Sequence, residues 1–168
     1  NGIIDIPIII PHSAAGIAVL SIITRESLLG RAADVVGIRF IDRPAGIMLA
    51  MAFVSLPFLI NSARDGFAAV PERLEKIALT LGASPVRVFF TISLPLAWRS
   101  VLSGLILMWA RGMSEFGAVV IVAYNPKTAP VLIFERFTSY GLQYATPVAA
   151  IFVTVCLLIF VFLRLVKK

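Results

Sequence analysis

Apolar residues along this chain gather in four stretches, separated by shorter polar and basic segments. The stretches cover about residues 3–24, 44–62, 101–123 and 146–166. A helix that crosses a bilayer needs about 20 mostly apolar residues, so each stretch is long enough to span a membrane. The pattern therefore predicts an all-α, polytopic transmembrane helix bundle with about four spans in this chain.

Polar residues and prolines interrupt two of these stretches. Asp5, Pro7, Pro11 and His12 fall in the first stretch, and Arg111 and Glu115 in the third. Such interruptions are tolerated where neighbouring helices or a polar path satisfy the freed backbone groups. The segments SAAG (13–16) and SVLSG (100–104) supply small residues for close helix contacts, although ordinary packing explains each small residue equally well.

Residues 71–95, here called the amphipathic stretch, are too polar to span a bilayer comfortably. Pro71 can occupy the first position of a helix, where its missing N–H costs nothing. The apolar residues at helical spacing are Leu74, Ile77, Ala78 and Leu81. They form a single stripe along one side of a short helix.

Turn signals divide the amphipathic stretch into two helices. Gly82 ends the first helix, because glycine readily adopts the left-handed conformation of a C-terminal cap. Ser84 can cap the second helix, with Pro85 at its first position, and Pro95 is expected to end it. An amphipathic hairpin lying on lipid is the alternative interpretation.

Composition and charge narrow the class of protein. The chain is 60% hydrophobic and carries a formal net charge of +6, with basic residues scattered between apolar runs. This distribution is typical of loops that flank membrane spans and does not favour nucleic acid as a partner. Four spans would put the amphipathic stretch and the basic C-terminus on one side, and a slight excess of Lys and Arg there favours the cytoplasm.

The amphipathic stretch resembles the EAA loop of permease subunits of ATP-binding-cassette importers. That pattern is Glu-Ala-Ala, three residues, Gly, nine residues, Ile, one residue, Leu-Pro. The matching residues of this chain are Lys76, Ile77, Ala78, Gly82, Ile92, Leu94 and Pro95. Every spacing is kept, but Lys76 and Ile77 replace the glutamate and the first alanine, and Glu75 stands one residue earlier.

The resemblance implies that this stretch forms cytoplasmic coupling helices that insert into a groove on a separate ATPase. The residues it implicates are Glu75, Lys76, Ile77, Ala78, Leu81, Gly82, Ala83, Ser84 and Arg87. It further implies a pair of ATPase subunits, a second copy of the permease and an external binding protein as partners. A membrane scaffold that recruits an ATPase without transport is an alternative.

Residues 109–137 and 5–20 resemble the oxyanion permeases for molybdate, tungstate and sulfate, whose recurring triplet is Glu115-Phe116-Gly117 here. The resemblance implies a permease subunit importing a tetrahedral oxyanion across a prokaryotic plasma membrane. Molybdate or tungstate is favoured, with sulfate as the alternative. Such permeases have about six spans, so N-terminal spans are expected to be missing from this chain.

Arg111 and Glu115 lie four residues apart and should share a helix face. They either form a structural ion pair or line the anion pathway, where a guanidinium offers several donors to an oxyanion. His12 is expected to be a packed or hydrogen-bonded histidine. No Walker A pattern, catalytic dyad or metal-ligand spacing occurs. We therefore expect no enzyme activity, no catalytic residue, no cofactor and no metal ion in this chain.

Overall fold

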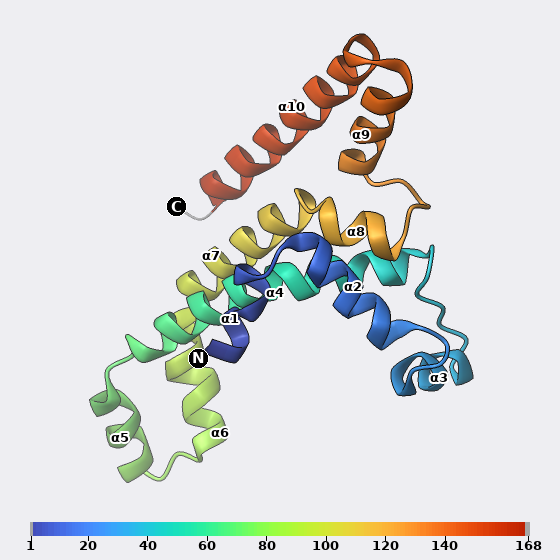
Figure 1. The fold of residues 1–168 in the computed structure, drawn as a ribbon. Helices are drawn as coiled ribbons and strands as arrows, with labels where there is room; N and C mark the ends of the chain where they lie inside the picture. Colours follow the sequence, from blue (N-terminus) through green and yellow to red (C-terminus); the bar gives the residue numbers. More distant parts are fainter. Residues whose placement is uncertain (1, 167–168) are drawn as a thin grey trace.

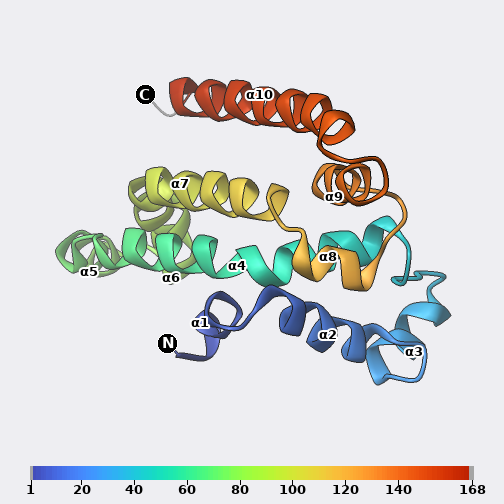
Figure 2. The same cartoon turned by 45° about the horizontal axis from the view of Figure 1, so that its top comes forward.

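A computed structural model describes residues 2–166, and all the regular structure in that range is helical (Figures 1 and 2). The elements in chain order are α1 (Gly2–Ile9), α2 (His12–Ile23), α3 (Leu28–Val35), α4 (Pro44–Ala68), α5 (Glu72–Thr80), α6 (Pro85–Val88), the π-helical turn η1 (Phe89–Ser93), α7 (Leu94–Met113), α8 (Gly117–Val122), α9 (Ala129–Tyr140) and α10 (Leu142–Val166). The prediction of an all-α chain is confirmed.

Helix α4 is the central element, and α7 runs beside it (Figure 1). Small residues allow the two backbones to approach. A Cβ at Gly104 would lie 2.8 Å from the Cβ of Ser62, and the Ser62 hydroxyl donates to the Ser100 carbonyl at 2.7 Å. The predicted role of the SVLSG segment in close helix contact is confirmed.

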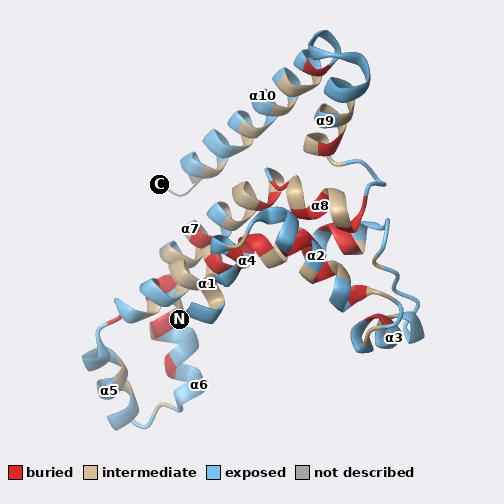
Figure 3. Cartoon of the chain, viewed as in Figure 1, coloured by how far each residue is buried: buried red, intermediate tan, exposed pale blue. Residues whose placement is uncertain are grey.

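A second close contact joins α2 to α8. A Cβ at Gly16 would lie 2.9 Å from the Cα of Ala118. Around this contact the buried apolar side chains of α2, α4 and α8 form the core, with Val54 and Val119 almost without exposure (Figure 3). The SAAG segment therefore also serves close packing, as predicted.

Among the residues that the structure describes, three helical segments are long and apolar enough to cross a membrane: Pro44–Ala68, Pro85–Met113 and Leu142–Leu165. The first predicted span is not one straight helix, because α1 and α2 meet at a bend of 117°. The bounds predicted for the third span, residues 101–123, are wrong. Its helix begins at Pro85, stops at Met113, and is separated from α8 by a short break.

The prediction that Pro95 ends the second helix of the amphipathic stretch is wrong. Segments α6, η1 and α7 form one continuous helix through Pro95. Immediately before the proline the helical hydrogen bonds change from a spacing of four residues to one of five, since the Leu94 N–H donates to the Phe89 carbonyl. A π turn changes the register of the ladder, and Pro95 then stands in the first turn of α7, where its missing N–H removes little.

Helices α9 and α10 form a hairpin beside the α4 and α7 pair (Figure 1). Val131 of α9 is buried in the core, and α10 contacts α7. Gly141 makes the turn at a φ of +86°. No residue of the most apolar part of α10 is buried, so its side chains are available to lipid or to another helix. Both views show α10 ending toward the same side of the molecule as α5 (Figures 1 and 2); Lys167 and Lys168 lie outside the described residues.

Candidate functional site

The bend of the amphipathic stretch is built as the sequence predicts. Gly82 has a φ of +88°, and the Ala83 N–H donates to the Ala78 carbonyl at 3.1 Å, which closes the end of α5. The Ser84 hydroxyl then accepts from the Arg87 N–H at 3.3 Å, with Pro85 in the first turn of α6. Pro71 was expected at the first helical position, but it is the N-cap residue, so α5 begins one residue later, at Glu72.

One side-chain contact joins α5 to η1, and another joins η1 to α4. The Ser93 hydroxyl donates to Glu75 Oε1 at 2.6 Å, which links the middle of α5 to the end of η1. The ring of Phe89 stacks on Phe67 of α4, with 5.7 Å between the centroids. The Glu75 carboxylate is therefore hydrogen-bonded within the chain. The helix before the Gly82 bend is joined to the helix after it, and that second helix packs on α4.

The predicted apolar stripe of the amphipathic stretch is left uncovered. No residue of α5 is buried, and Leu81 is 82% exposed. Phe90 and Val86 of the following helix are also more than half exposed. A capped hairpin with an uncovered apolar side is a surface suited to a protein partner or to lipid.

Lys76 does not extend toward Glu75 but pairs with Glu72, at 2.6 Å between Nζ and Oε2. The pairing lowers the pKa of Glu72 and raises the pKa of Lys76, through the hydrogen bond first and charge attraction second. Both side chains are mostly exposed, so this pair adds little rigidity.

A second group of polar side chains lies at the breaks between helices. His12, Arg111 and Glu115, here called the junction cluster, come from the start of α2, the end of α7 and the break before α8. Arg111 Nη1 lies 2.8 Å from Glu115 Oε2, so the predicted proximity of the two residues is confirmed. They do not share a helix face, because α7 ends at Met113 and Glu115 lies in the break that follows. Arg111 Nη2 lies 2.9 Å from His12 Nε2, so one guanidinium bridges both partners.

Burial distinguishes the members of the junction cluster. The Glu115 side chain is 1% exposed, that of Arg111 22% and that of His12 48%. The other carboxylate oxygen of Glu115 accepts from the Ala118 N–H at 2.9 Å, in the first turn of α8. A buried carboxylate needs such partners, and here it links the end of α7 to the beginning of α8.

The triplet Glu115-Phe116-Gly117 has a separate structural task for each residue. Glu115 makes the contacts just described, and the ring of Phe116 lies 4.9 Å from that of Phe134 in α9. A Cβ at Gly117 would lie 2.8 Å from the Cβ of His12, so a glycine lets α2 begin directly against α8. The triplet therefore brings three segments of the chain to one point.

Sequence reasoning identified Arg111 and Glu115 but did not join His12 to them. His12 was expected to be packed or hydrogen-bonded. Its side chain is 48% exposed, and it contacts Arg111, 99 residues away. The available signal was the proline before it, since Pro11 marks the break at which a polar side chain can face the interior. Within residues 2–166, no group of three His, Cys, Asp or Glu side chains is arranged to hold a metal ion.

Similarity to known proteins extends over the whole chain. Among curated relatives, the molybdate/tungstate transport system permease protein WtpB of Pyrococcus abyssi is 52% identical over 164 residues, which cover 98% of this chain and 61% of that protein. WtpB of Methanocaldococcus jannaschii is 44% identical, over 98% of this chain and 65% of its own length. The sulfate transport system permease protein CysT of Synechocystis is 29% identical, over 100% of this chain and 60% of its own.

The chain thus spans about three-fifths of the length of these relatives. The family model described as the binding-protein-dependent transport system inner membrane component matches residues 1–168. The identity to WtpB and the helices able to cross a membrane agree with this match to a membrane component. This chain belongs to the family of inner membrane components of binding-protein-dependent transport systems.

Proposed function

We propose that this chain is the membrane-spanning permease part of an ATP-driven importer for a tetrahedral oxyanion, with molybdate or tungstate as the cargo. The observation that carries the proposal is the bent, capped and uncovered hairpin of α5 and α6, in a chain of this family. Four relatives named molybdate/tungstate permeases, at 44–52% identity, support the choice of cargo. Sulfate is the second candidate, because this chain is less similar to the sulfate permease CysT of Synechocystis, at 29% identity.

In this proposal the exposed side of α5 and α6 docks on a cytoplasmic ATPase. The contacting residues would be Leu81, Ala83 and Arg87 around the Gly82 bend, with Lys76, Ile77 and Ala78 replacing the family's usual motif. Glu75 is tied to Ser93 and would act by holding α5 in place, with no direct contact to the ATPase. Because α6 continues through η1 into α7 as one helix, a push on the bend is passed to a membrane-spanning helix as rigid-body motion.

The remaining partners follow from the same proposal. A second copy of the permease completes the pathway, a pair of ATPase subunits binds the two hairpins, and an external binding protein delivers the anion. The hairpin and the end of α10 would both face the cytoplasm. Their position toward the same side of the molecule supports this orientation (Figure 2).

For the junction cluster we propose a structural role first. Both terminal nitrogens of Arg111 already contact protein groups, so a passing oxyanion would compete with Glu115 for them. A role of Arg111 in the pathway is the alternative. Weak and partly cancelled attraction suits passage better than tight binding does.

One double variant separates these two roles. Arg111→Gln with Glu115→Gln removes both charges together, which avoids an unpaired buried charge. If the pair is structural, the variant assembles and still transports. If Arg111 contacts the anion, the variant assembles, and uptake is lost.

The test of the proposed function is uptake of labelled molybdate into vesicles containing the full-length permease and its ATPase. Uptake should require ATP and the external binding protein, and unlabelled tungstate should compete better than sulfate. ATPase association without any anion flux would contradict the transport proposal and favour a scaffold. Preferential competition by sulfate would move the assignment to the sulfate permeases.

A further inference from the structure

Arg87 is an exposed basic side chain that lies among exposed apolar ones at the Gly82 bend. Val86 precedes it, Phe90 lies one helical turn further on, and Leu81 stands just before the bend. These three apolar residues are 67%, 60% and 82% exposed, respectively. We call Leu81, Val86, Arg87 and Phe90 the tip patch. The bend that carries it projects beyond the end of α4 (Figure 1).

The tip patch lies outside the hydrocarbon layer of the membrane. Trp98 and Arg99 belong to the same continuous helix as Arg87, and both are exposed. Exposed Trp and Arg residues at the end of an apolar run are typical of a membrane–water boundary. About 18 Å of helix separates Arg87 from Arg99. The apolar side chains of the tip patch are therefore beyond the acyl chains, and a protein partner is needed to cover them.

The chain itself supplies no carboxylate to Arg87. Within residues 2–166, no Asp or Glu oxygen lies within 4.0 Å of its guanidinium group. The two glutamates of α5 are engaged elsewhere, because Glu72 pairs with Lys76 at 2.6 Å and Glu75 accepts from Ser93 at 2.6 Å. The donors of Arg87 are therefore available to a partner.

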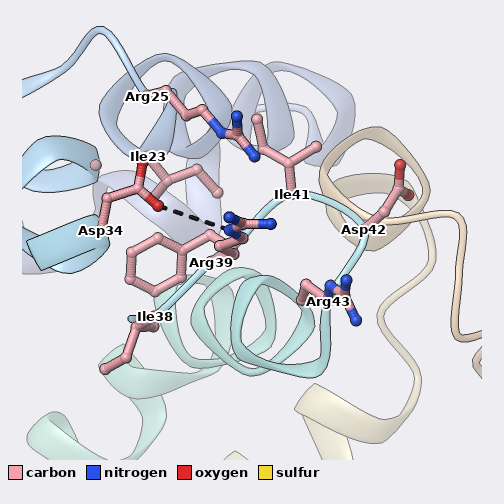
Figure 4. Close-up of a pocket in the computed structure, with 10 residues that line it drawn as sticks. Ile23, Arg25, Asp34, Ile38, Arg39, Ile41, Asp42 and Arg43 are labelled. Atoms are coloured by element: carbon pink, nitrogen blue, oxygen red, sulfur yellow. Dashed lines mark ion pairs between the residues drawn. The ribbon is translucent and has the colours of Figure 1, made fainter. Parts of the chain in front are cut away.

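The opposite end of α4 shows a different arrangement of arginines. A pocket of about 220 Å³ there is lined by Arg25, Arg39 and Arg43, and Asp34 and Asp42 line it with them (Figure 4). Asp34 Oδ1 lies 4.0 Å from Arg39 Nε. Acidic side chains of the chain itself thus offset the positive charge of that pocket, whereas the tip patch contains none.

We propose that Arg87 pairs with a carboxylate of the cytoplasmic ATPase, in an apolar groove that covers Leu81, Val86 and Phe90. The inference rests on the proposed function, in which this hairpin docks on the ATPase, and adds the chemistry of the surface that receives it. When apolar side chains are buried by a partner, an arginine among them loses its water and must be paired. A carboxylate fits a guanidinium through two parallel hydrogen bonds, and arginines in such apolar surroundings are frequent hot spots of protein interfaces.

The test is the affinity of the full-length permease for its ATPase, measured in nanodiscs of phosphatidylcholine and, separately, of phosphatidylglycerol. Arg87→Gln leaves the carboxylate of the ATPase buried without its charge partner, so affinity should fall by about thirtyfold. Arg87→Lys keeps the charge but cannot make both hydrogen bonds. Its affinity should lie between those of wild type and Arg87→Gln.

Arg73→Gln is the matched control. Arg73 is an exposed arginine of the same hairpin, and in the described part of the chain it likewise has no carboxylate within 4.0 Å. It lies in the first turn of α5, away from the bend and outside the tip patch. Its replacement removes the same charge and should change affinity by less than about threefold.

Three results would overturn the inference. Unchanged affinity in Arg87→Gln would show that Arg87 has no charge partner in the complex, and equal losses in Arg73→Gln and Arg87→Gln would indicate only diffuse attraction. A loss that occurs in phosphatidylglycerol but not in phosphatidylcholine would assign Arg87 to an anionic lipid. The wild type separates this inference from the proposed function. If it binds the ATPase and imports molybdate, these results refute only the ion pair, whereas a wild type that does not bind the ATPase would contradict the proposed function itself.

Discussion

The amphipathic stretch and the junction cluster both contain polar residues in a largely apolar chain, but they are built in opposite ways. The amphipathic stretch is contiguous in sequence, and its apolar stripe is uncovered. The junction cluster joins residues up to 103 positions apart, His12 to Glu115, and its carboxylate is 1% exposed. One region leaves an apolar surface uncovered, on which we propose that a partner docks, and the other connects interrupted helices within the chain.

This difference predicts different consequences of mutation. A change on the exposed hairpin should impair association with the ATPase while the chain itself stays stable. A change in the junction cluster that leaves a buried charge unpaired should destabilise the chain first, and loss of transport should follow from that. The predictions below test this separation, beginning with the largest expected effect.

Glu115→Ala should give the largest loss of stability. It leaves the Ala118 N–H without its acceptor and Arg111 without its charge partner. Breaking a buried ion pair costs about 3 kcal/mol, here reduced by the partial exposure of Arg111. The measurement is the thermal unfolding of the purified permease in detergent.

Glu115→Gln is the matched control for that experiment. An amide oxygen can still accept from Ala118, so this variant should lose less stability than Glu115→Ala. If the two variants unfold at the wild-type temperature, Glu115 does not hold the junction. The proposed contrast between the two regions would then be wrong.

The same contrast explains what the sequence could predict. Gly82, Ser84 and Pro85 act on their immediate neighbours, so the bend was predictable from the sequence alone. The continuation of the helix through Pro95 was not predictable from the sequence, because it depends on a π turn that local propensities do not specify. Contact of His12 with Arg111 depends on the 117° bend between α1 and α2, a tertiary arrangement that helical periodicity cannot indicate.

Gly82→Val should give the next largest effect, and on a different observable. A β-branched residue at a φ of +88° costs about 1–2 kcal/mol locally. The strain should distort the bend and abolish association with the ATPase, measured by co-purification, with uptake lost as well.

Gly141→Val is its control, because Gly141 has nearly the same φ of +86° and, like Gly82, open space around its Cα. Because Gly141 also has a ψ of 179°, a region essentially restricted to glycine, a valine there should be strongly strained. Even so, only Gly82→Val should lose the ATPase. Equal loss of association in both variants would attribute the effect to general instability of the chain.

Ser93→Ala should have a smaller effect. It removes the donor to Glu75 that ties α5 to η1, a contact worth about 1 kcal/mol. We expect weaker association with the ATPase and little change in unfolding temperature. Ser103→Ala is the control, because the Ser103 hydroxyl donates only to the Arg99 carbonyl of its own helix; equal effects in both variants would rule out a positioning role for Glu75.

Lys76→Ala should have the smallest effect, because Lys76 and Glu72 form an exposed pair. The lowered pKa of Glu72 makes the contribution of the pair complete above the usual pKa of 4.5, and it is lost as pH falls through the lower folded value. The raised pKa of Lys76 makes the contribution complete below 10.5, and it is lost as pH rises through the higher folded value. Between these limits, unfolding temperature should differ from wild type by a small and pH-independent amount, measured in detergent across neutral pH. A large loss of ATPase association in this variant, with stability unchanged, would instead assign Lys76 a direct contact with the partner, at the position where the family usually has a glutamate.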